Sequence, residues 1–213
     1  MLMTSSRAIA VAPCFRPIRS KTGRLVSDVV PTRGPDVDAA VLRIQRNYEV
    51  RGMLAKVTSY NAVSSGTVVN ESAFTYDAFG NLILDQQSHS GIVTGATPAV
   101  AYTYANASAN TVRRTSTRYP DGKILQVFYG SGHSIDDHLG RVAKLQFQGE
   151  SIPLVEYTYV GVAWQVRVGY TGPAVELIYK KQGSEPVGDA GDPYNGYDRF
   201  GRTQDIRWQS TTT

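Results

Sequence analysis

The chain has 213 residues, which is long enough for one hydrophobic core or for a run of stacked repeats. Hydrophobic residues make up 41% and charged residues 19%, which excludes a largely disordered chain. A single cysteine, Cys14, excludes an internal disulfide, and no apolar run reaches the roughly 18 residues that a membrane-spanning helix needs. Thirteen tyrosines against six phenylalanines, together with 20 glycines and 10 prolines, favour strands and turns over helices.

Residues 1–36 are expected to form a disordered basic leader. Four prolines, Pro13, Pro17, Pro31 and Pro35, interrupt any lasting period of 2 or 3.6 residues. Six basic residues against one acid in residues 1–35 account for the whole formal charge of +4, so the rest of the chain carries no basic footprint for nucleic acid. The only apolar stretch is short and contains Pro13, so there is no clear signal peptide.

From residue 37 onward the sequence alternates between strand-forming segments and turns. The segment VLRIQRNYEV (41–50) is rich in Val, Ile and Tyr, which predicts a strand. Further strands are predicted at AVAYTYA (99–105), PLVEYTYVG (153–161) and WQVRVGY (164–170). This pattern predicts an all-β fold over residues 37–213.

One short phrase recurs along this region, with a glycine four residues after a tyrosine. It occurs at Tyr48–Gly52, Tyr76–Gly80 and Tyr197–Gly201, with Asp136 replacing the tyrosine before Gly140 and with one residue fewer at Tyr119–Gly122. Its chemistry is that of a hairpin turn, because an Asp after the tyrosine accepts backbone N–H bonds and glycine adopts positive φ without strain. Gly80 and Gly201 are therefore predicted to have positive φ. The tyrosine is expected to pack its ring on the sheet and to place its hydroxyl at a wet rim.

These phrases resemble the signature of the Rhs/YD-repeat family, Tyr-Asp-x-x-Gly-Arg with a Tyr-x-Tyr strand nearby. The segment 197–202 (YDRFGR) matches the signature in full, and 76–81 (YDAFGN) lacks only the arginine. The segments 102–104 and 157–159, both YTY, match the strand. The segments 183–196 and 198–208 are similar to sequences in planctomycete-type Rhs proteins. The resemblance covers about residues 37–213.

This resemblance implies antiparallel hairpin repeats that form a curved sheet strip, as part of a YD-repeat β-shell. Shells of this family enclose a toxin or form the barrel of surface proteins, so the family is expected at the cell surface or secreted, and the compartment of this chain stays open. The chain is too short to close a shell, so we expect a region that is incomplete at its C-terminal end. Asp192-Pro193 lacks the surroundings of the family's self-cleavage motif and is interpreted as a turn.

The stretch GSGHSIDDHLG (130–140) is the main candidate for chemistry. His133, His138, Asp136 and Asp137 are metal-ligand types, but their spacing is that of no standard site, and neighbouring aspartates on a strand would face opposite sides. A polar hairpin loop is the preferred interpretation, with a hydrolase at this loop kept as a third hypothesis. His89 is expected to be solvated in a turn. We therefore predict no catalytic, cofactor-binding or metal residues, and no enzyme activity.

Two function hypotheses remain from different classes. The first is a non-catalytic structural fragment of a YD-repeat shell that encloses or displays other polypeptide, in toxin delivery or cell-surface interaction. The alternative is a carbohydrate-binding surface module that uses an aromatic concave face with Trp164 and Trp208, although filling of that face by these rings is preferred. Asn106 begins a glycosylation acceptor that matters only in a eukaryotic secretory setting.

The expected partners follow from the first hypothesis. They are other YD repeats of a longer chain or a like copy, with an encapsulated toxin domain or a surface glycan as candidates, and no nucleic acid and no membrane span. Because an open strip leaves edge strands unpaired, the isolated chain is expected to be marginally stable and to self-associate.

Overall fold

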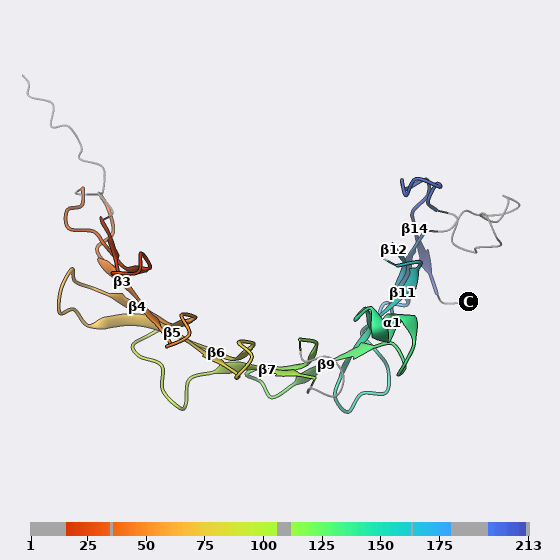
Figure 1. Cartoon of the computed structure of the whole chain (residues 1–213), viewed down its shortest axis with the longest axis horizontal. Coiled ribbons are helices and arrows are strands. Elements are labelled where there is room, and N and C mark those ends of the chain that lie inside the picture. The colour runs from red at the N-terminus through yellow and green to blue at the C-terminus, as the bar shows by residue number, and fades with distance from the viewer. Residues whose placement is uncertain (1–15, 35, 106–111, 163, 180–195, 212–213) are drawn as a thin grey trace, which may run out of the picture. The chain divides into compact units, whose positions relative to one another are not determined.

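The structure is a computed structural model that describes residues 16–34, 36–105, 112–162, 164–179 and 196–211 (Figure 1). The described part of the chain contains fourteen strands and one short helix. The strands of the first half are β1 (Arg16–Arg19), β2 (Leu25–Val29), β3 (Arg43–Tyr48), β4 (Leu54–Tyr60), β5 (Val68–Tyr76), β6 (Leu82–Ser88) and β7 (Ala99–Tyr104). Those of the second half are β8 (Arg114–Arg118), β9 (Ile124–Tyr129), β10 (Val142–Phe147), β11 (Val155–Val160), β12 (Trp164–Tyr170), β13 (Val175–Ile178) and β14 (Arg207–Ser210). The helix α1 covers Ile135–His138.

The strands form one antiparallel sheet in which each strand pairs with its neighbours in chain order, from β1 to β14. The prediction of an all-β fold built from successive hairpins is confirmed. Within the described residues β1 and β14 are each paired on one side only, so the sheet is open. The chain divides into two compact units, Met1–Ala101 and Tyr102–Thr213, where a single region was expected.

The sheet begins well before residue 37, which changes the expected boundary. β2 pairs with β3 through Ser27 and Gln45, and β1 pairs with β2. The expectation of disorder therefore does not hold for residues 16–34, while residues 1–15 lie outside the described part. Proline was a misleading signal here, because Pro17 lies in the edge strand β1, where a missing N–H is tolerated. Pro31 follows the end of β2.

The recurring phrase forms hairpin turns, as predicted. Gly80 has a φ of 88° and Gly201 a φ of 83°, and the glycines of the other three phrases also have positive φ. The pairing register shifts at Tyr48 and at Tyr76, immediately before their turns. A bulge at this position accompanies hairpin loops that place glycine at positive φ. The phrases that end at Gly52, Gly80 and Gly122 thus each form one tight connection between antiparallel strands, whereas the phrase that ends at Gly140 contains the helix α1.

Because the described strands lie in one sheet, few side chains are fully buried and each unit has a thin core. In the first unit the carboxylate of Glu71, only 4% exposed, accepts hydrogen bonds from Lys56 Nζ at 2.9 Å and from Thr58 Oγ1 at 2.8 Å. Its third donor is the backbone N–H of Val93, in the loop after β6. Burial by itself raises the pKa of Glu71, but these hydrogen bonds together lower it by more, so the net pKa lies below its usual value.

The core of the second unit is made of β-branched side chains. Val127, Val155, Val166, Val168 and Ile178 are buried, and Val166 is 1% exposed. Valine and isoleucine suit a pleated surface because their branched side chains pack closely against cross-strand neighbours. Val166 and Val168 lie on β12, which pairs with β11 on one side and with β13 on the other.

Candidate functional site

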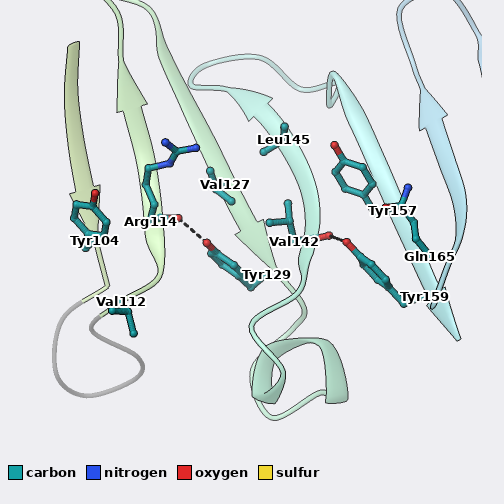
Figure 2. A pocket seen from close by; sticks show the side chains of 10 residues that line it. All are labelled: Tyr104, Val112, Arg114, Val127, Tyr129, Val142, Leu145, Tyr157, Tyr159 and Gln165. Carbon is teal, nitrogen blue, oxygen red and sulfur yellow. Dashed lines mark hydrogen bonds between the residues drawn. The ribbon is translucent and has the colours of Figure 1, made fainter. Parts of the chain in front are cut away.

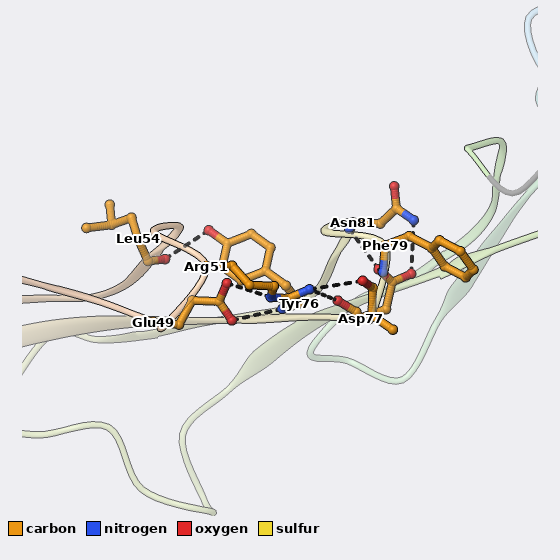
Figure 3. A network of polar contacts seen from close by, with 8 residues as sticks. Glu49, Arg51, Leu54, Tyr76, Asp77, Phe79 and Asn81 are labelled. Atoms are coloured by element: carbon orange, nitrogen blue, oxygen red, sulfur yellow. Dashed lines mark hydrogen bonds and ion pairs between the residues drawn. The ribbon is translucent and has the colours of Figure 1, made fainter.

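The aspartate of the recurring phrase closes its own turn. Asp77 Oδ1 accepts hydrogen bonds from the backbone N–H groups of Phe79 and Asn81, both at 2.9 Å, and Asn81 Nδ2 donates to Oδ2 (Figure 3). Hydrogen bonds from the side chain and backbone of Asn81 hold the pKa of Asp77 below its usual value. Asp198 repeats the arrangement with Phe200 and Arg202. The aspartate is therefore a turn-forming residue in both copies.

The tyrosine of the phrase ties its turn to the preceding hairpin. Tyr48 donates its hydroxyl proton to the carbonyl of Leu25 at 2.8 Å, and Tyr76 donates to Leu54 at 2.9 Å. Each of these acceptors stands two residues after the glycine of the preceding turn, Gly23 or Gly52. The hydroxyls are thus half-buried and bonded to backbone, and the expected place at a wet rim is wrong for these residues.

The same bond recurs in the second unit. Tyr159 donates to the carbonyl of Val142, two residues after Gly140, at 2.9 Å. Tyr129 likewise donates to the backbone carbonyl of Arg114, and Tyr197 donates to that of Gln165. Burial, together with neighbouring Tyr179, raises the pKa of Tyr197 to about 12.

In several copies a residue one to three positions after the turn glycine covers the next turn. Met53 Sδ lies 3.4 Å from the position that a Cβ on Gly80 would occupy. The ring of Trp164 lies only 2.6 Å from the corresponding position on Gly201, and its centroid is 4.8 Å from that of Tyr197. Trp164 therefore packs against the following turn, which supports the packing interpretation of this ring over sugar stacking.

Arginine takes this covering position in several copies. The guanidinium of Arg24 lies 5.6 Å from the Tyr48 ring centroid and also over Gly52, and that of Arg141 lies 4.7 Å from the Tyr159 ring centroid. Cations over aromatic faces are attracted by the ring quadrupole. In these two copies the Gly-Arg pair thus places a cation on the tyrosine of the next copy, whereas Arg202 of the full signature forms an ion pair with Asp198 in its own turn. We call this succession of hydroxyl–carbonyl bonds and covering side chains the turn ladder.

A second set of arginine bonds reinforces the turn ladder. Arg51 Nη1 donates to the carbonyl of Asp77 at 2.6 Å and to that of Ala78, while Glu49 holds the same guanidinium from its own turn (Figure 3). Arg141 Nη1 donates in the same way to the carbonyl of Gly161 at 2.7 Å. These bonds satisfy turn carbonyls that a tight connection would otherwise leave to water.

The stretch 130–140 connects the antiparallel strands β9 and β10, as a hairpin loop does, and contains the short helix α1, which was not expected. Ser134 caps the helix and accepts from the N–H of Asp137. Asp137 also accepts from Arg113 Nη1 at 2.7 Å, and Asp136 forms an ion pair with Arg141. Within the described ranges no group of three metal-ligand side chains comes together. Asp136 is thus the partner of Arg141, which belongs to the turn ladder, and Asp137 is the partner of Arg113.

The histidines and the remaining sequence candidates are placed as follows. The rings of His133 and His138 lie 6.2 Å apart, and His89 is exposed in its turn, as expected. Asn106 and Asp192-Pro193 lie outside the described residues. No helix in the described part is long and apolar enough to span a membrane.

A groove of about 650 Å³ lies on one face of the second unit, across β7 to β12 (Figure 2). Its floor carries Val127, Val142 and Leu145, and four tyrosines line it, including Tyr157 and Tyr159. Burial raises the pKa of both of these tyrosines. The groove has the composition of a ligand site, an apolar surface with a few polar groups.

Three polar side chains of the groove retain hydrogen-bonding capacity. Arg114 forms no ion pair with any carboxylate of the described residues, and its guanidinium lies 5.6 Å from the Tyr102 ring centroid. The Tyr157 hydroxyl and the Gln165 amide likewise form no hydrogen bond within the described ranges. Sequence reasoning missed this groove, because its lining comes from six strands whose alignment depends on register.

Sequence reasoning also missed two members of the turn ladder. Gly23-Arg24 carries the Gly-Arg pair of the signature without a preceding tyrosine, and this pair was the available signal. The turn at Gly161, with a φ of 60°, has no such pair.

In the comparisons with known proteins, matches are found among solved structures. No protein-family model matches the chain, and no curated protein matches it. Among solved structures, the pore form of the Tc holotoxin of Photorhabdus luminescens, with a TccC3 mutation, aligns with 92% of this chain at 14% identity and a TM-score of 0.45. The chain spans 10% of the length of the chain that it matches there.

Proposed function

We propose that the chain is a non-catalytic structural module of the Rhs/YD-repeat kind, whose sheet builds part of a wall that encloses or displays other polypeptide. The observation that carries this proposal is the turn ladder. Tyrosine bonds to the preceding hairpin, aspartate closes its own turn, glycine provides the positive φ, and in several copies a residue just after the glycine covers the following turn. The tyrosine and the covering residue therefore join each turn to its neighbour, which is the property of a repeat.

The partner of such a module is a further β-sheet, supplied either by additional YD repeats or by a second copy of this chain. The two described edges differ in how they receive another strand. β1 carries Pro17 between Arg16 and Arg19, and both proline and charge discourage strand addition. β14 has no proline, and its Trp208 is 64% exposed. We therefore expect association through β14.

Sedimentation velocity over a concentration series tests this role. The sedimentation coefficient should rise with concentration, and Trp208→Lys should return it to the monomer value, because an edge lysine opposes strand pairing. Phe200→Lys is the matched control, since Phe200 is similarly exposed at 69% but lies in a turn. A monomer at all concentrations, or equal effects of the two variants, would contradict the wall-building role. Ester hydrolysis by the chain that is lost in His138→Ala would contradict its non-catalytic part.

One observation favours carbohydrate binding as a second candidate function. Trp208 stacks on Tyr170 with ring centroids 5.9 Å apart, and the two rings are 64% and 38% exposed. A pair of exposed aromatic faces suits the apolar face of a sugar ring. Binding on a glycan array that is lost in Trp208→Ala and kept in Phe200→Ala would establish this function.

A further inference from the structure

We infer that the groove on the second unit binds an extended peptide segment that carries an acidic side chain among aliphatic ones. This inference rests on the proposed function, because it names the kind of polypeptide that the wall would contact. Its residues are separate from the turn glycines and from the edge strand β14, so its test is independent of self-association.

The charge of the groove selects for an anion. Among the described residues Arg114 is the one charged side chain that lines it, and its guanidinium stands among the groove side chains in Figure 2. The Tyr129 hydroxyl donates to the backbone carbonyl of Arg114 at 2.9 Å, which fixes the start of β8, and the guanidinium forms no ion pair with a carboxylate of the described residues. A guanidinium only donates hydrogen bonds and matches the two oxygens of a carboxylate.

The floor of the groove suits aliphatic side chains better than sugar rings. Val127, Val142 and Leu145 present branched apolar surface between the tyrosines (Figure 2). The ring of Tyr129 already faces the Arg113 guanidinium at 4.6 Å, and that of Tyr159 faces Arg141 at 4.7 Å. Rings that carry a cation on one face and a bonded hydroxyl offer less stacking surface to a sugar. Peptide side chains are therefore favoured over an acidic oligosaccharide.

The dimensions of the groove indicate an extended ligand. Arg114 lies on β8 and Tyr157 on β11, three strand spacings apart, which is about 14 Å. An extended peptide covers that distance in about four residues. At the far end the Tyr157 hydroxyl and the Gln165 amide can hydrogen-bond to a peptide backbone, since each offers both a donor and an acceptor. The ligand thus places its acid about four residues from the backbone that these two groups contact.

The test is fluorescence anisotropy with two labelled nine-residue peptides of alternating valine and threonine, one with a single central glutamate and its twin with glutamine. The glutamate peptide should bind about tenfold more tightly, the scale of a hydrogen bond to a charged group. Arg114→Gln should remove that difference, and Tyr157→Phe should weaken both peptides. Arg199→Gln is the control, because Arg199 is an exposed arginine outside the groove and should leave binding unchanged.

Three results would overturn the inference. They are equal affinity for the two peptides, binding of the glutamate peptide that is unaffected by Arg114→Gln, or tighter binding of an oligogalacturonate probe than of the glutamate peptide. Sedimentation of Arg114→Gln should match that of the wild type. If peptide binding fails while self-association persists, the groove assignment is wrong and the structural role stands.

Discussion

Replacement of Gly201 by alanine tests whether the turn ladder stabilises the fold. Gly201 has a φ of 83°, and a Cβ at this position would lie 2.6 Å from the Trp164 ring. Gly122 is the matched control, because its φ is 86° and a Cβ there would meet nothing within 4 Å. Both variants incur the cost of positive φ, roughly 1–2 kcal/mol. Only Gly201→Ala must also displace a packed ring, which adds roughly 1–3 kcal/mol.

The difference between the two variants is therefore expected to be about 2 kcal/mol in the free energy of unfolding. With a urea m-value of about 2 kcal/mol/M, this separates their midpoints by about 1 M. Tryptophan fluorescence is the assay, because both tryptophans, Trp164 and Trp208, lie in the second unit and report its unfolding.

A double variant makes the test sharper. In a Trp164→Leu background the smaller side chain can move aside, so the extra cost of Gly201→Ala should largely disappear. Equal midpoints for Gly201→Ala and Gly122→Ala, or additive effects in the double variant, would refute the idea that neighbouring turns are coupled.

Three further predictions concern the hydroxyl bonds and the pH range of stability. Tyr76→Phe should destabilise the first unit by about 1 kcal/mol because it removes the bond to the Leu54 carbonyl, measured by hydrogen exchange, whereas Tyr60→Phe should have little effect. Because the pKa of Glu71 is lowered in the folded state, this residue stabilises the fold above its unfolded pKa of about 4.3, and the stabilisation is lost as the pH falls through the folded pKa. The stability of Glu71→Gln, measured by thermal melts in acid, should therefore depend less on pH than that of the wild type below about pH 4.3. Tyr197, with its pKa raised to about 12, stabilises the fold fully below the unfolded value of about 10 and loses this contribution as pH rises, so alkaline unfolding should begin later in Tyr197→Phe. An unchanged alkaline midpoint in that variant would contradict the prediction.

Residues 130–140 connect β9 and β10 as a hairpin loop, but the short helix within this connection was not predicted from the sequence. Ser134 and Asp137 have the spacing of a helix cap, a local signal for the short helix that the sequence interpretation did not use. The partner of Asp137 could not be found in this way, because Arg113 is 24 residues away and reaches the carboxylate through the pairing of strands, whereas Arg141 follows Asp136 closely in the sequence. The groove could not be predicted from the sequence for the same reason, since the register of β7 to β12 brings its lining residues together.

The sequence by itself determined the hairpins. The positive φ of Gly80 and Gly201 and the turn bonds of Asp77 and Asp198 depend on residues within five positions of one another, so they follow from local chemistry. The tertiary structure alone decided how the hairpins are joined. The carbonyl that Tyr76 reaches is 22 residues away, and the ring that covers Gly201 comes from Trp164. Such contacts exist only once strands are aligned, because register sets which side chains share a face and which turns become neighbours.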